Sequence, residues 1–130
     1  MTEAMDIFEW LEGAAERFDD GEPHPYTIFG NIRSATYDYD DDAVRAGRIE
    51  FERLARTYDQ PWLGVFGRHW ELQYRLTSKR EGATAVADAV AAFERSHRED
   101  TIDCPQSMCA VQDLCIASVS YTHLTLPTIA

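Results

Sequence analysis

Residues 43–76 read AVRAGRIEFERLARTYDQPWLGVFGRHWELQYRL, and their spacing decides the fold class. In the first half, apolar residues recur every three or four positions while arginine and glutamate fill the positions between them, which predicts an amphipathic helix. Asp59-Gln60 ends this helix, and Pro61 begins the next one because proline is tolerated in a first helical turn. The predicted apolar stripe consists of Val44, Gly47, Phe51, Leu54, Ala55 and Tyr58.

The next helix runs from Trp62 to about Ser78 and is apolar on most of its sides. A helix that faces solvent on one side needs only one apolar stripe. We therefore expect this helix to be central, with neighbours on two flanks, and Gly82 to mark the turn after it. Its apolar residues are Trp62, Leu63, Phe66, Trp70, Leu72, Tyr74 and Leu76.

Upstream, the acidic cluster Asp40–Asp42 has the composition of a helix N-terminus, where carboxylates accept unpaired backbone N–H groups. Residues 20–41 are harder to assign. Gly30-Asn31 could form a hairpin turn, but a helix or a loop is favoured because every neighbouring segment is helical. A first amphipathic helix is predicted before them, with Phe8, Leu11, Ala15 and Phe18 on one face.

Two further helices are predicted downstream. Residues 83–100 have high helix propensity, and Val86, Ala89, Val90, Phe93 and His97 would share one face. Asp103-Cys104-Pro105 then starts a helix that contains QSMCAVQDLC, with Met108, Val111 and Cys115 in a stripe.

The segments YDQPWLGVFGRHWELQYRL, EGATAVADAVAAFERSHRED and CPQSMCAVQDLC resemble tetratricopeptide-like helical-repeat proteins of high-GC bacteria. The similarity lies in the opening at Asp59–Trp62, in Ala89 and Phe93 as A-x-x-x-F, and in the spacing of Leu76 before them. The repeat's other Trp, Gly, Tyr and Pro positions do not match, nor do the first 40 residues. The resemblance implies an all-α fold of antiparallel helix hairpins stacked as a short TPR-like α-solenoid, with a scaffold role and no catalysis.

The C-terminal segment breaks this pattern, because Leu114–Ala130 contains no charged side chain. Its threonines, proline and alternating leucines do not continue a helical stripe, and SVSYTHLTLPT closely resembles the translated read-through of a sequencing-library adapter. We therefore expect residues 1–115 to be a helical-repeat domain that is cut within a helix, and residues 116–130 to be a non-native tail. A truncated solenoid exposes an apolar face, so self-association is expected.

Charge and cysteine content restrict the partners. The formal charge of −11, from 23 acidic against 12 basic residues, argues against nucleic acid and anionic membranes and favours a basic partner. No apolar run is long enough to span a bilayer, and the N-terminus lacks the features of a secretory signal. Three cysteines crowded between 104 and 115 do not form a disulfide framework, which indicates reduced thiols in a cytoplasmic protein.

No metal or cofactor site is predicted. An EF-hand loop starting at Asp38 fails because Ala43 and Ile49 stand where glycine and glutamate are required. His97 and the three cysteines could supply four zinc ligands, but their spacing is wrong. Cys104, at a helix start, is the best placed for a reactive thiolate. His69 is expected to be a packing residue, since a general base needs a poised neighbour and a pocket, and the sequence shows neither.

The chain is therefore expected to bind a protein or peptide through a groove in the segment WLGVFGRHWELQYR. Two alternatives remain open, a complete small helical regulatory or dimerisation domain and a small all-α enzyme or metal-binding domain. The tryptophans themselves are expected mainly in the core. The candidate partner-binding residues are Trp62, Phe66, Arg68, His69, Trp70 and Arg75.

Overall fold

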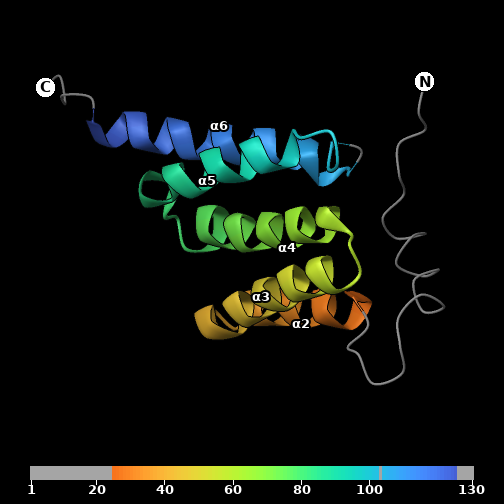
Figure 1. The fold of residues 1–130 in the computed structure, drawn as a ribbon. Coiled ribbons are helices and arrows are strands. Elements are labelled where there is room, and N and C mark those ends of the chain that lie inside the picture. Colours follow the sequence, from red (N-terminus) through yellow and green to blue (C-terminus); the bar gives the residue numbers. More distant parts are fainter. Residues whose placement is uncertain (1–24, 103, 126–130) are drawn as a thin grey trace, which may run out of the picture.

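The computed structural model describes residues 25–102 and 104–125, and this part of the chain forms five α-helices (Figure 1). The helix predicted around Phe8–Phe18 lies outside the described residues. A π-helical turn, η2, continues α4, and together they make up the helix predicted from Trp62 to Ser78. The elements are α2 (Pro25–Tyr37), α3 (Asp41–Thr57), α4 (Pro61–Gln73), η2 (Tyr74–Ser78), α5 (Gly82–Ser96) and α6 (Gln106–Thr125).

Consecutive helices pack mostly as adjacent antiparallel pairs. In Figure 1, α2 and α3 lie at one end of the stack, α4 lies in the middle, and α5 and α6 lie at the other end. The central helix α4 contacts α3, α5 and α6, which confirms that it has neighbours on two flanks. The all-α class is confirmed.

Three connections reverse the chain through a residue in the left-handed backbone region. Tyr39, Asp59 and Arg80 have φ values of 53°, 51° and 54°. Next to each of them, a backbone N–H returns to a carbonyl near the end of the preceding helix, as in common helix C-terminal motifs. The N···O distances are 3.0 Å for Asp40 to Ala35, 2.9 Å for Gln60 to Ala55 and 2.8 Å for Glu81 to Arg75. These short turns place consecutive helices side by side.

The segment after Pro25 is a helix, so the hairpin alternative for residues 20–41 is wrong. Ile28, Ile32 and Ala35 recur at helical spacing and are buried against the rest of the core, which a period-two strand pattern could not achieve. The predicted start of α3 is confirmed. The Asp40 carboxylate accepts a hydrogen bond from the Ala43 backbone N–H at 3.1 Å.

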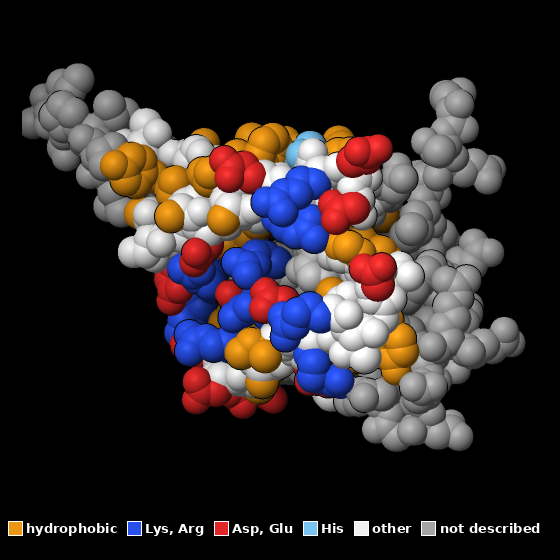
Figure 2. Space-filling model, viewed as in Figure 1, with side chains coloured by type: hydrophobic (Ala, Val, Ile, Leu, Met, Phe, Trp, Pro, Cys, Tyr) orange, Lys and Arg blue, Asp and Glu red, His pale blue; other side chains and the backbone are white. Residues whose placement is uncertain are grey.

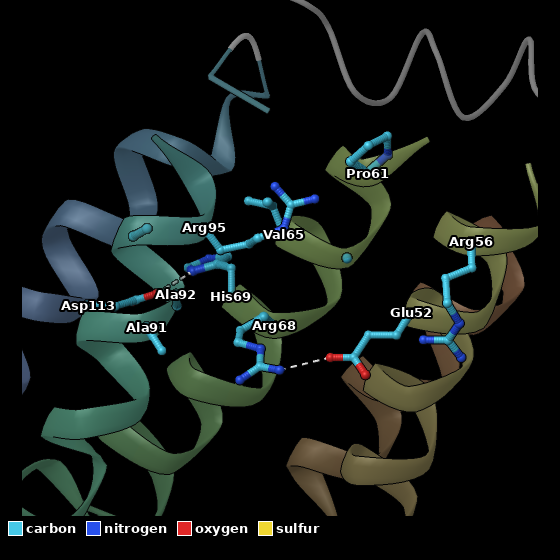
Figure 3. Close-up of a pocket in the computed structure, with 12 residues that line it drawn as sticks. Glu52, Arg56, Pro61, Val65, Arg68, His69, Ala91, Ala92, Arg95 and Asp113 are labelled. Carbon is cyan, nitrogen blue, oxygen red and sulfur yellow. Dashed lines mark hydrogen bonds and ion pairs between the residues drawn. The ribbon is translucent and has the colours of Figure 1, made fainter. Parts of the chain in front are cut away.

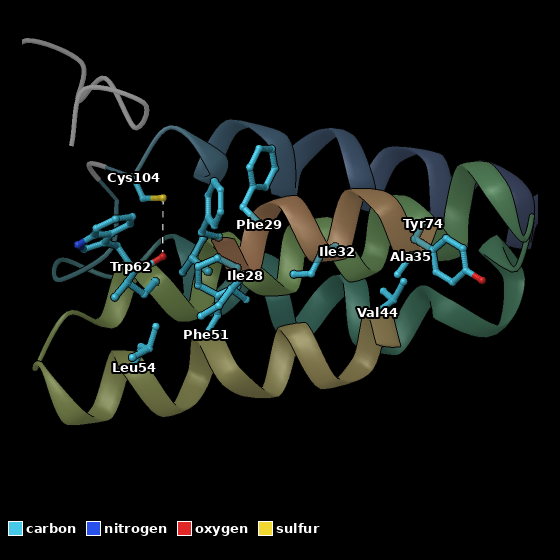
Figure 4. Packing of buried hydrophobic residues seen from close by; sticks show 13 residues of the cluster. Ile28, Phe29, Ile32, Ala35, Val44, Phe51, Leu54, Trp62, Tyr74 and Cys104 are labelled. Carbon is cyan, nitrogen blue, oxygen red and sulfur yellow. Dashed lines mark hydrogen bonds between the residues drawn. The ribbon is translucent and has the colours of Figure 1, made fainter. Parts of the chain in front are cut away.

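The first core cluster joins α2, α3 and α4 (Figure 4). Glycines allow these helices to approach closely. A Cβ added to Gly47 would collide with Ile32, and one added to Gly67 would lie 2.6 Å from the Phe51 Cβ atom. Phe51 and Phe66 also meet edge to face, with ring centroids 5.1 Å apart. The buried members of this cluster are Ile28, Phe29, Ile32, Ala35, Val44, Phe51, Leu54, Trp62, Leu63, Val65, Phe66, Tyr74 and Cys104.

The predicted inner face of α5 is confirmed at Ala89, which is buried, and at Val86, which is partly buried and packs against the same core cluster, but it is wrong at Val90 and His97. Val90 is 38% exposed and His97 is exposed, whereas Ala85, Ala89, Ala92 and Ser96 are buried. Small side chains let the backbones of neighbouring helices approach, so burial follows the alanine stripe rather than the bulkier one. Gly82 is the first residue of α5 rather than a turn residue, and a Cβ added to it would collide with Ser120 of α6.

The predicted stripe of α6 is also wrong. Met108 is 71% exposed and Cys115 is exposed, while Ser107, Ala110, Asp113 and Ala117 are buried. Residues 116–125 also belong to this helix, although the sequence was expected to stop following a helical pattern in this stretch. Ala117 and Ser120 are small enough to pack on α5, so this stretch needs neither charge nor bulky apolar side chains to do so.

Candidate binding groove

Two cavities lie along one face of the molecule, where α4 forms the floor and α3 and α5 form the walls. We call this face the α4 groove. The first cavity, the arginine cavity, has a volume of about 350 Å³ and is bounded by α3, α4, α5 and α6. The second, the ion-pair cavity, has a volume of about 420 Å³ and lies toward η2. Figure 2 shows Lys and Arg side chains gathered across the middle of this face, with acidic side chains among them.

A chain of ion pairs connects α3 to α4 between the two cavities. Arg48 donates from Nε to Glu71 Oε2 at 2.8 Å and from Nη1 to Glu52 Oε1 at 2.9 Å, and Arg68 Nη2 reaches the same Glu52 oxygen at 2.8 Å. Burial acts to raise the pKa of Glu52, but the hydrogen bond from Arg68 and the charge of Arg48 outweigh it and lower that pKa. The Glu52 carboxylate is therefore an ionised partner of both arginines.

Three guanidinium groups from three helices surround the arginine cavity: Arg56 from α3, Arg68 from α4 and Arg95 from α5 (Figure 3). Two carboxylates, Glu52 and Asp113, also line it. With a neutral histidine the lining carries one net positive charge, although the whole chain carries −11. The acid excess of the protein therefore lies elsewhere than at this cavity.

A buried histidine–carboxylate pair forms part of the same lining. His69 Nδ1 lies 2.7 Å from Asp113 Oδ2, and the two side chains are only 9% and 4% exposed. An ionised Asp113 can only accept, so Nδ1 would donate. The other ring nitrogen, Nε2, makes no hydrogen bond within the described part of the chain. The pair joins α4 to α6 and supplies the neighbour and the pocket that the sequence did not show.

The ion-pair cavity contains four basic and four acidic side chains. Arg75 Nη1 lies 2.6 Å from Asp88 Oδ2, and Lys79 Nζ lies 3.4 Å from Asp41 Oδ2. The Tyr74 hydroxyl donates to Asp41, and burial together with this bond raises the pKa of Tyr74 to about 12. The positive and negative charges that line the ion-pair cavity are equal in number. This cavity therefore attracts an ionic ligand less strongly than the arginine cavity does.

The structure divides the six predicted partner-binding residues into two sets. Arg68 and His69 line the arginine cavity, and Arg75 lines the ion-pair cavity. Trp62 and Phe66 are buried in the first core cluster, and the half-buried Trp70 packs on Phe29 with ring centroids 5.0 Å apart. The tryptophans of α4 are therefore core residues.

Sequence reasoning did not identify Arg56, Arg95 or Asp113 as site residues. Pro61, Gly64, Val65, Arg68 and His69 form a stripe at helical spacing, which could have indicated the α4 part of the cavity. Asp113, by contrast, is 44 residues from His69. Only its place in the buried stripe of α6 marks it, and that stripe was predicted on the wrong side.

Among the described residues, the cysteines and their neighbours do not form a metal site. No group of three or more His, Cys, Asp or Glu side chains in the described residues could hold a metal ion. Burial raises the pKa of the Cys104 thiol to about 11, which disfavours the thiolate considered for it. His97 instead stacks on Phe93, with ring centroids 4.2 Å apart.

The chain matches no protein-family model, no curated protein and no solved structure. The observations therefore describe an all-helical protein of five helices in its described part, without a family assignment. No helix in residues 25–102 or 104–125 is long and apolar enough to cross a membrane.

Proposed function

We propose that this chain is a helical protein-interaction module whose α4 groove binds an acidic segment of a partner protein. The main support for this proposal is that the arginine cavity has a net positive charge, although the whole chain has a charge of −11. An acidic segment would be repelled by most of this protein and would meet unlike charge at the cavity. The acid excess read from the sequence favoured a basic partner, but the groove has the opposite local charge.

The dimensions of the groove suit an extended peptide. Helix α4 has 13 residues, which corresponds to a length of about 20 Å. An extended segment of about six residues has the same length. Along this length the arginine cavity would accept an acidic side chain, while the ion-paired surface near Arg48 and Glu71 would contact the peptide backbone.

The proposal includes the TPR-like relationship suggested by the sequence. In that interpretation the antiparallel helix pairs are units of an α-solenoid from a high-GC bacterium, and the role is a cytoplasmic scaffold without catalysis. The antiparallel pairing of consecutive helices supports it. The α4 groove would then be the partner-binding surface, formed by charged residues rather than by the tryptophans.

Fluorescence anisotropy with labelled peptides of about six to eight residues, the length that spans the groove, tests the proposal. Three peptide sets of matched apolar content, acidic, neutral and basic, would be titrated into the full chain at low and high salt. We expect saturable binding of acidic peptides that weakens with salt.

The double substitution Arg56→Glu with Arg95→Glu should abolish that binding, whereas Arg33→Glu, an exposed arginine on α2, should leave it unchanged. Equal affinity for basic peptides, retained affinity in the double variant, or no saturable binding of any acidic peptide would reject the proposal.

A further inference from the structure

The arginine cavity has an apolar side as well as a charged one. Val65 of α4, Ala92 of α5 and Ala110 of α6 line it, and all three are buried. The ion-pair cavity lacks such a wall, since Val44 is its only aliphatic lining residue among those described. A concave site with apolar walls and a few placed polar groups is the usual form of a small-molecule pocket.

The cationic groups of this cavity differ in how fully the protein occupies them. Arg68 is held by Glu52 at 2.8 Å. Arg95 contacts Asp100 at 3.2 Å in an exposed pair, which leaves most of its N–H groups available. Arg56 makes no ion pair within the described residues. Two guanidinium groups from α3 and α5 can therefore turn to a ligand without breaking the α3–α4 ion pairs.

The buried pair His69–Asp113 supplies a third polar group on the α6 side. Asp113 engages Nδ1 and fixes the orientation of the ring. Nε2 makes no hydrogen bond within the described part of the chain. In the neutral ring it is an acceptor, so it can take an N–H or O–H of a ligand but not a carboxylate oxygen. A ligand placed here would have the apolar wall on one side and the arginines on the other, and a negatively charged group on it would point to the guanidinium groups rather than to Nε2.

We propose that the arginine cavity binds a small organic carboxylate with a compact apolar body. One negative charge matches the single net positive charge of the lining. A dianion would leave excess negative charge beside Glu52 and Asp113, and a cation would face three arginines. The volume of about 350 Å³ is at the lower end of the range for small-molecule pockets. The proposal rests on the cavity itself and is independent of peptide binding.

Three probes of nearly equal shape test it: benzoate, the neutral benzamide and the cationic benzylamine. Binding to the full chain would be measured by isothermal titration calorimetry and by ligand-observed NMR. We expect saturable binding of benzoate at least about tenfold tighter than that of the other two, since charge-assisted hydrogen bonds are about twice as strong as neutral ones. Equal affinities for benzoate and benzamide, or no saturable binding of benzoate, would overturn the proposal.

Two variants locate the site. Arg95→Gln should weaken benzoate binding by about fivefold or more, as expected for the loss of one charged partner. Ala91→Leu, at an exposed rim position, should block the cavity without disturbing the core. Arg33→Gln, away from the cavity, should bind as the unmodified chain does. Retention of full affinity in Ala91→Leu and Arg95→Gln would also overturn it. Benzoate binding without acidic-peptide binding would retain this inference and reject only the proposed function.

Discussion

Asp113 of α6 lies 2.7 Å from the Nδ1 atom of His69 on α4, and each side chain is more than nine-tenths buried. No other ion pair in the described residues is buried to this degree on both sides. It connects the middle of the stack to its last described helix and forms one edge of the arginine cavity. The same contact therefore joins two helices and shapes the cavity.

Removal of one member of this pair should destabilise the fold. Asp113→Ala leaves the buried Nδ1 of His69 without a partner, so we expect a loss of about 2–3 kcal/mol in the free energy of unfolding. Urea denaturation followed by circular dichroism measures it. In a double-mutant cycle with His69→Leu, the losses should be less than additive, because the second substitution removes the group left unpaired. Additive losses would show that the pair makes no energetic interaction.

The two interhelical glycines should respond in a different way from an exposed one. Gly67→Ala places a Cβ 2.6 Å from the Phe51 Cβ atom, and the resulting shift of α3 from α4 should cost about 1–3 kcal/mol. Gly30→Ala on α2 is the matched control, since no atom lies within 4 Å of its added Cβ. It should stabilise the chain by about 0.5–1 kcal/mol through helix propensity. Thermal unfolding of both variants measures these changes. If both substitutions changed the melting temperature in the same direction, the close approach of α3 and α4 at Gly67 would be contradicted.

The left-handed turn residues give a stabilising prediction. Arg80 has φ 54° and an exposed side chain. Glycine adopts this region without the steric cost that an arginine Cβ carries, so Arg80→Gly should raise stability by about 1 kcal/mol. Arg80→Ala keeps a Cβ and should give no such gain. A melting temperature for Arg80→Gly at or below that of Arg80→Ala would contradict the assigned turn geometry.

Much of the fold was predictable where apolar spacing and turn chemistry agreed. Helices α3 and α4 follow from the stripe that contains Phe51 and Leu54 and from Pro61 at a helix start. The inner faces of α5 and α6 were not predictable, because alanine and serine side chains supply most of their buried positions. Whether such small side chains are buried depends on which helix lies opposite them. The buried Asp113 shows the same limit. From the sequence alone an aspartate on a helix is expected to face solvent, and only the fold brings His69 next to it.

The candidate site was predictable only in part. Arg68 and His69 of α4 and Arg75 of η2 lie on the groove side, whereas the aromatic residues proposed with them lie in the core. A helix that is apolar on most sides gives no indication from its own sequence of which polar positions face a cavity. The cavity-facing positions of α4 become evident only when Arg56 of α3 and Arg95 of α5 are seen to line the same cavity.

The outer side of α6 should mediate self-association. Met108 and Val119 lie on the same side of the last described helix, since 11 residues make about three full turns, and they are 71% and 58% exposed. Sedimentation velocity at increasing concentration should show a shift to larger species, which Met108→Glu with Val119→Glu should abolish because burying those charges is costly. A monomer at all concentrations would contradict the prediction.

The hydrogen bond between Tyr74 and Asp41 predicts a loss of stability in alkaline solution. Burial, with the bond to Asp41, raises the pKa of Tyr74 from its ordinary value of 10.0 to about 12 in the folded chain. The folded state thus favours the neutral phenol, and its stabilising contribution is complete below pH 10 and lost as the pH rises toward 12. Urea denaturation between pH 9 and 12 should therefore show a steeper loss for the unmodified chain than for Tyr74→Phe. Parallel curves for the two proteins would mean that this phenol titrates alike in the folded and unfolded states, contrary to its buried contact with Asp41.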